Sequence, residues 1–238
     1  MFYGGLMGYY FDPTWILVII GAVLSMAASA KVNSTFSKYS KVRSMTGMTG
    51  EDAAKRLLNS QGIYDVTVRP VKGQLTDHYD PRTKTVNLSE SVFHSTSGAA
   101  SGVAAHECCQ AMQDNVGYVP LKLRGAIVPV ANIGSQAAFP LIIFGVLIGG
   151  MGSPLVNIGL ILFSLAVIFQ LITLPVELNA SRRAITLLDQ VGILGGQEVN
   201  QTRKVLGAAA LTYVAALAAS VLQLLRLVIL FGGRRDND

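Results

Sequence analysis

Charged side chains are scarce in this sequence. Only 14% of the 238 residues are Asp, Glu, Lys or Arg, whereas soluble globular domains carry about 25%. The mean hydropathy of +0.46 points the same way. A chain with so little charge cannot cover the surface of a wholly soluble fold, so the composition indicates a membrane protein.

Cysteine is scarcer still, and the two residues present, Cys108 and Cys109, are neighbours. On a helix their side chains point about 100° apart, which disfavours a disulfide between them. Because there is no third cysteine, the disulfide framework that stabilises many small secreted domains is excluded.

Long apolar runs are what the sequence has instead. Four of them, each roughly long enough to cross the ~30 Å hydrocarbon layer as a helix, cover residues 15–30, 125–150, 155–174 and 205–231. The first run is not preceded by Lys or Arg, as a signal peptide would be. It follows Asp12 and the aromatic cluster Tyr9, Tyr10 and Phe11, which is typical of a membrane interface.

These runs predict the domain organisation. We expect a retained membrane anchor over residues 1–30 and a soluble domain over residues 31–124, the only polar stretch long enough to fold alone. A transmembrane hairpin should follow over residues 125–174, with its turn at residues 151–154. A shorter helical segment over residues 175–204 and a final transmembrane helix with its tail over residues 205–238 complete the chain.

The basic residues gather beside the apolar runs, which explains the net charge of +5 without nucleic acid as a partner. They lie after the first run, before the second and between the third and fourth: Lys31, Lys38, Lys41, Arg43, Lys122, Arg124, Arg182, Arg183, Arg203 and Lys204. Basic loops face the cytoplasm and anionic lipid. We therefore expect a multi-pass protein of the cell membrane with a cytoplasmic soluble domain, although Arg234 and Arg235 then lie outside, against the rule.

The soluble stretch has a readable order of elements. Thr49 with Asp52 three residues on predicts a helix start, and Gly62 its end. Alternating residues predict strands around Val66–Val71 and over residues 83–88, and Ser97 opens a helix over residues 97–115. Helix, strand, strand and long helix are typical of half of a zincin domain. The predicted fold class is an α-helical integral membrane protein with a small α+β zincin-like cytoplasmic domain.

His106 and Glu107 lie on that last helix, in the pattern of a zinc-peptidase motif. In H-E-x-x-H, two imidazoles one turn apart bind Zn²⁺ and the glutamate is the general base. Here the fifth position is Gln110, a neutral amide and a poor zinc ligand. Cys109 is three residues from His106, and its thiolate is an alternative ligand. The motif leaves open which of the two side chains fills the missing position.

Three blocks together resemble the membrane-bound neutral zinc metallopeptidase family, the YugP-like group. They are residues 75–86 (LTDHYDPRTKTV), residues 103–118 around His106 and Glu107, and residues 174–184 (LPVELNASRRA). The resemblance implies Zn²⁺ held by His106 and Glu177, with Glu107 as the catalytic base and Gln110 standing where the family has a second His. Without the resemblance, Glu177 could equally be an interfacial ion-pair partner of Arg182 or Arg183.

The predicted function is a membrane-embedded zinc-dependent endopeptidase that cleaves peptides or proteins near the membrane surface, impaired by Gln110. The alternative is an inactive pseudopeptidase that acts as a membrane scaffold or chaperone. A small transporter is a third possibility. However, no acidic residue lies deep inside an apolar run, which argues against a proton relay. His78 or Tyr79 could contact an oxyanion, and His94 is a distant candidate for an extra ligand.

Overall fold

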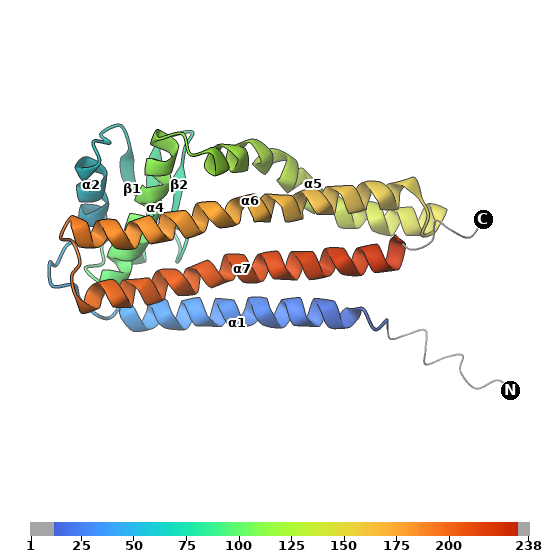
Figure 1. The fold of residues 1–238 in the computed structure, drawn as a ribbon, viewed down its shortest axis with the longest axis horizontal. Coiled ribbons are helices and arrows are strands. Elements are labelled where there is room, and N and C mark those ends of the chain that lie inside the picture. The colour runs from blue at the N-terminus through green and yellow to red at the C-terminus, as the bar shows by residue number, and fades with distance from the viewer. Residues whose placement is uncertain (1–11, 233–238) are drawn as a thin grey trace. The chain divides into compact units, whose positions relative to one another are not determined.

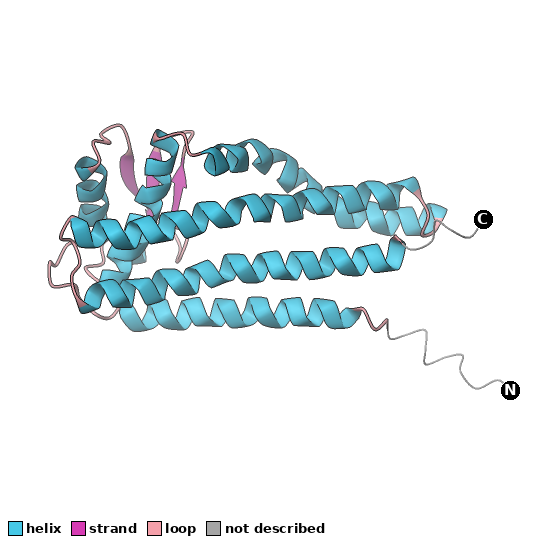
Figure 2. Ribbon diagram, viewed as in Figure 1, coloured by secondary structure: helices cyan, strands magenta, loops and turns pink. Residues whose placement is uncertain are grey.

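The computed structural model describes residues 12–232, in which helices predominate and three short strands form one small sheet (Figures 1 and 2). The aromatic residues Tyr9, Tyr10 and Phe11 and the basic residues Arg234 and Arg235 lie outside the described residues. The elements in chain order are α1 (Trp15–Tyr39), α2 (Gly50–Ser60), β1 (Thr67–Val71), β2 (His78–Asp80), β3 (Thr85–Ser89), α3 (Glu90–Phe93), α4 (Gly98–Asn115), α5 (Val119–Gly149), α6 (Pro154–Gln190) and α7 (Gln197–Phe231).

Within the described part of the chain, four helices are long and apolar enough to cross a membrane: α1, α5, α6 and α7. Each coincides with one of the predicted apolar runs and extends beyond it at one end at least, although α5 ends at Gly149, one residue before the end of its run. Helix α6 does not end at the predicted boundary before Pro175 but continues to Gln190. Proline removes one backbone hydrogen bond, and long apolar helices tolerate this. Glu177 therefore lies on a regular helix rather than at a helix end.

The chain divides into two compact units. One comprises residues 1–27, 126–171 and 214–238, as far as they are described, and the other comprises residues 28–125 and 172–213. The polar segment after Pro175 thus belongs to the same unit as the residues between the first and second apolar runs.

Arg226 is accommodated in the first unit by two contacts with the start of α1. One guanidinium nitrogen, Nη2, lies 3.2 Å from Asp12 Oδ2, and the group stacks over the ring of Trp15 at 4.2 Å from its centroid. Further along, Gly21 lies so close to Ala219 that a Cβ on the glycine would meet Ala219 Cα at 3.0 Å. These contacts pair α1 with α7 in antiparallel register.

The second unit contains the sheet, with strand order β1-β3-β2. Strand β3 is central: β1 pairs with it in parallel, Thr67 opposite Thr85, and β2 pairs with it antiparallel, Tyr79 opposite Val86. The sequence predicted β1 and β3 but not β2 or the short helix α3. Strand β2 is only three residues long, too short to display an alternating pattern.

Both predicted helix starts in this unit are confirmed. Thr49 and Asp52 form a reciprocal capping box at α2, and Ser97 accepts a hydrogen bond from the backbone of Ala100 at α4. Small residues on α4 and leucines of α2 pack against the sheet, and the same core includes Ala180, Ala184 and Leu188 of α6. Helix α4 therefore packs against the sheet, α2 and α6.

The packing at the start of α2 gives a testable prediction. A Cβ on Gly50 would lie 2.3 Å from the carbonyl oxygen of Val92, whereas a Cβ on Gly207 would meet nothing within 4 Å. Gly50→Ala should lower the free energy of unfolding by about 1–3 kcal/mol through overpacking. Gly207→Ala, the control, should be neutral or slightly stabilising because alanine favours a helix. Thermal denaturation in detergent measures both, and equal melting temperatures would contradict the close approach of α2 and α3.

Candidate metal centre

Helix α4 places three polar side chains toward α6. His106 and Gln110 are one turn apart, and Gln113 lies almost one turn further, so all three share one face. The amide of Gln113 donates to the backbone oxygen of Val176 at 3.1 Å and to Asn179 Oδ1 at 2.8 Å. These bonds fix the spacing of the two helices beside Glu177, which is only 1% exposed.

His106, Gln110 and Glu177 meet in a triangle of polar atoms. His106 Nε2 lies 3.0 Å from Glu177 Oε2, Gln110 Nε2 lies 3.2 Å from His106 Nε2, and Gln110 Nε2 lies 3.3 Å from both Glu177 oxygens. On the other side of the ring, His106 Nδ1 lies 3.1 Å from Ser181 Oγ. Residues 71 positions apart in the chain are therefore direct neighbours.

Without a metal, hydrogen bonds can hold this triangle together. When His106 carries a proton on Nε2, both this N–H and the amide of Gln110 donate to the carboxylate of Glu177. The two donor nitrogens then lie 3.2 Å apart because they share one acceptor group. When Nε2 is unprotonated, its lone pair faces the carboxylate, and that contact is repulsive.

A cation in the centre of the triangle would make all three contacts attractive. The imidazole lone pair, a carboxylate oxygen and the amide oxygen, with the amide turned over, would all point inward. The pairwise distances of 3.0–3.3 Å are close to the ~3.3 Å edge of a tetrahedron with zinc–ligand bonds of 2.0–2.1 Å. The three residues therefore fit Zn²⁺ in geometry, with one weak donor. Over the described residues, no group of three His, Cys, Asp or Glu side chains could hold a metal, since the third donor here is an amide.

Glu177 has a cationic partner that the sequence did not predict. Arg124 Nη1, from the start of α5, lies 2.7 Å from Glu177 Oε1. The alternative partners Arg182 and Arg183 are five and six positions along α6, off the face that carries Glu177, and they line a separate groove. Arg124 occupies one carboxylate oxygen and leaves Oε2 for the triangle. The hydroxyl of Tyr213, from α7, also faces this carboxylate.

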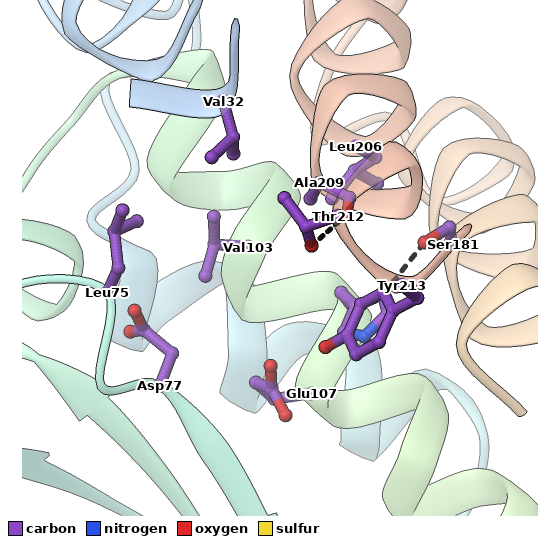
Figure 3. Close-up of a pocket in the computed structure, with 11 residues that line it drawn as sticks. Val32, Leu75, Asp77, Val103, Glu107, Ser181, Leu206, Ala209, Thr212 and Tyr213 are labelled. Carbon is purple, nitrogen blue, oxygen red and sulfur yellow. Dashed lines mark hydrogen bonds between the residues drawn. The ribbon is translucent and has the colours of Figure 1, made fainter. Parts of the chain in front are cut away.

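Glu107 points into a cavity of about 220 Å³ beside the triangle (Figure 3). Burial raises its pKa to about 7, although neighbouring His106 opposes the shift. Burial alone would lower the pKa of His106, but the hydrogen bond to Glu177 and the charge of Glu107 outweigh it, so that pKa is raised. A carboxyl group with a pKa near neutrality can both accept and return a proton at physiological pH.

Both polar and apolar side chains line the cavity. The polar ones are His106, Glu107, Ser181, Thr212, Tyr213 and Asp77, the last from the loop before β2. The apolar lining comes from four segments of the chain: Val32, Leu75, Val103, Leu206 and Ala209. Asp77 is held in place because Ser89 donates to it from its backbone nitrogen at 2.7 Å and from its hydroxyl.

The other candidate residues lie elsewhere. Cys109 is completely buried in the hydrophobic core, and burial raises its pKa to about 12. Cys108 is likewise buried, its thiol 3.6 Å from the backbone oxygen of Ala54. The hydroxyl of Tyr79 donates to Asp114 at 2.9 Å, and neither it nor the exposed His78 lines the cavity. His94 stacks edge-on against Phe93. Gln110, and not Cys109, therefore occupies the third corner.

Comparison with known proteins identifies the family of this chain. The profile of a family described as "putative neutral zinc metallopeptidase" matches residues 14–232. The chain belongs to this family. It is 48% identical over 222 residues to a Bacillus subtilis (strain 168) protein named "putative membrane protease YugP", covering 93% of this chain and 98% of that relative. No solved structure matches the chain.

Sequence reasoning about this zinc metallopeptidase family member missed Arg124, Ser181 and Tyr213 as neighbours of the triangle. The sequence around Arg124 indicates only a topology-setting charge beside an apolar run. Ser181 lies four residues after Glu177, and that helical spacing could have predicted it. Tyr213 lies in an apolar run with no local signal, so only the packing of α7 reveals it.

The burial of the two thiols gives the next prediction. A thiol with a pKa near 12 is almost entirely protonated at pH 8, whereas the thiolate is the form that reacts. Iodoacetamide should therefore modify Cys109 and Cys108 at least about a hundredfold more slowly in the folded, detergent-purified protein than in the denatured protein. Mass spectrometry measures the labelled fraction over time. Rapid labelling of Cys109 in the folded protein would contradict its place in the core and restore it as a metal-ligand candidate.

Proposed function

We propose that this protein is a membrane-anchored zinc-dependent endopeptidase whose zinc is held by His106, Glu177 and the amide oxygen of Gln110. One observation carries the proposal: the three side chains converge at 3.0–3.3 Å, close to the ~3.3 Å separation of ligand atoms around a tetrahedral zinc ion. When bound, Zn²⁺ would polarise a scissile carbonyl and lower the pKa of a water molecule. The protein's own side chains perform the proton transfers.

Glu107 is the proposed general base. Its carboxylate lines the cavity beside His106, and a pKa of about 7 leaves roughly half of it ready to accept a proton from water at neutral pH. The same carboxyl group can then return this proton to the leaving amine. Ser181 orients His106 from behind through Nδ1, and Arg124 orients Glu177 through Oε1. Such partners of ligands fix ring and carboxylate geometry.

The proposed domain type is zincin-like, with β2 as the substrate-binding edge. Strand β2 has β3 on one side only, and the backbone nitrogen of Tyr79 in this strand lies near Glu107. An extended peptide could add to this edge as a further strand. We place the unit formed by residues 28–125 and 172–213 on the cytoplasmic side because its basic residues flank the apolar runs. Peptides close to the membrane are then the expected substrates.

One observation favours a second candidate, the inactive scaffold. An amide is uncharged and binds Zn²⁺ less well than imidazole, and Arg124 already compensates part of the charge on Glu177. A chain that loses zinc would keep its substrate cavity and its membrane helices. It could then hold membrane clients without cleaving them. Zinc content and hydrolysis separate these two candidates.

The metal centre is tested by substituting its weakest ligand. In detergent-purified protein, Gln110→His should bind about one zinc per chain, at least about tenfold more tightly than the wild type, because imidazole replaces the amide. Casein hydrolysis should rise with it. Glu177→Ala should lose zinc in either background, and Cys109→Ser should retain it. Atomic absorption after dialysis measures the metal.

Three outcomes of that experiment are decisive. Zinc in the wild type, lost with Glu177→Ala, supports the endopeptidase. Zinc and hydrolysis only in Gln110→His identify the natural chain as the scaffold. No zinc in Gln110→His, in protein that keeps its melting temperature, would contradict the metal centre itself.

The role of Glu107 has a separate test. In the Gln110→His background, Glu107→Gln should reduce kcat for casein or a quenched peptide by about 10²–10⁴-fold, the usual contribution of a general base, while leaving zinc content unchanged. Glu90→Gln makes the same carboxyl-to-amide change on an exposed residue and should keep full activity. An active Glu107→Gln variant would assign the base elsewhere.

A further inference from the structure

A second cavity, distinct from the candidate metal centre, lies between α1 and α7. This groove has a volume of about 350 Å³. Three lysines, three hydroxyl-bearing residues and two apolar residues line it: Lys31, Lys38, Lys204, Ser34, Thr35, Tyr39, Ala208 and Leu211. All of these residues belong to the unit of residues 28–125 and 172–213. No residue of this groove lines the cavity beside Glu107.

Helical spacing builds the groove from both sides. On α1, Lys31, Ser34, Thr35 and Lys38 are separated by three, one and three positions and so share one face. On α7, Lys204, Ala208 and Leu211 are separated by four and three positions and so also share one face. Ala208 is only 3% exposed, so its small side chain forms the floor between the helices. Polar side chains therefore line the walls of the groove, and the methyl group of Ala208 lines its floor.

The three lysines carry positive charge that the protein does not neutralise. Among residues 12–232, none of Lys31, Lys38 and Lys204 forms a salt bridge. Lys38 lies over the ring of Tyr39 at 5.3 Å from its centroid, and no Asp or Glu lines the groove. Three lysines that line one groove without a carboxylate favour an anionic ligand.

The apolar ends of the two helices decide which kind of anion fits. Lys31 directly follows the apolar run of α1, and Leu211, half-exposed at 50%, lies within the apolar run of α7. Leu211 therefore places an apolar side chain beside the lysines of the groove. A ligand that matches the whole groove has an anionic head beside the lysines and a hydrocarbon tail beside Leu211. Lysines at such a boundary attract anionic headgroups.

We propose that this groove is a binding site for one anionic phospholipid, whose phosphate contacts Lys31, Lys38 and Lys204 and whose acyl chains follow Leu211 along α7. Ser34, Thr35 and Tyr39 supply hydroxyl donors for the headgroup. The site is independent of the proposed peptidase activity. The same two helices contribute Val32, Leu206 and Ala209 to the cavity beside Glu107. A lipid in the groove would therefore hold together two helices that also line that cavity.

The test uses the full chain in a zwitterionic detergent and two readouts. Native mass spectrometry should show one phosphatidylglycerol molecule retained per chain, and added phosphatidylglycerol should raise the melting temperature, since a ligand of the folded state stabilises it. Phosphatidylcholine should do neither. The triple variant Lys31→Gln/Lys38→Gln/Lys204→Gln should bind phosphatidylglycerol roughly tenfold to a hundredfold more weakly.

A matched control removes the same charge elsewhere. Lys55→Gln/Lys72→Gln/Lys84→Gln, all outside the groove, should bind phosphatidylglycerol like the wild type. Replacing the three groove lysines by arginine should also preserve binding, which keeps the test valid if the glutamine variant folds poorly. Unchanged binding in the glutamine variant would overturn the proposal. So would equal stabilisation by inorganic phosphate alone, which would indicate a soluble anion, or stronger stabilisation by an oligonucleotide.

Discussion

The burial of the Glu177 carboxylate constrains the rest of this site. Taking a carboxylate out of water costs several kcal/mol unless partners compensate the charge. Arg124 supplies a full positive charge at 2.7 Å, and His106 and Gln110 supply polar contacts at 3.0–3.3 Å. These partners come from α4 and α5, whereas Glu177 lies on α6. The charge can therefore be buried only when all three helices occupy their places.

Within the unit of residues 28–125 and 172–213, α4 is also joined to α6 and α7. Gln113 bridges the backbone of α6, and Thr202 of α7 donates to the backbone oxygen of Gly98 at 3.0 Å. A Cβ on Gly102 would lie 2.5 Å from Thr202, so α4 and α7 are also in close contact. Helices α6 and α7 thus form walls of the site and are also candidates to span a membrane.

Gln110 occupies a position where family members are expected to carry a ligand. A neutral amide preserves the shape of the triangle, because it reaches both His106 and Glu177, but it donates less electron density to a metal than imidazole. In the proposed zinc site, Gln110 would therefore weaken zinc binding while it keeps its contacts with His106 and Glu177. The neighbouring Cys109 cannot compensate, since its side chain is directed into the hydrophobic core.

The sequence by itself determined the local features: four apolar helices, the capped starts of α2 and α4, two of the three strands, and the family, through His106, Glu107 and the block around Glu177. These depend on spacing and composition within a few residues. Only the tertiary structure decided that Gln110 rather than Cys109 faces Glu177, that Arg124 is its ion-pair partner, and that Tyr213 and Ser181 adjoin the site. Those contacts join residues that are far apart in the sequence, some by more than a hundred positions. The packing of helices brings them together, and no local sequence pattern encodes that packing.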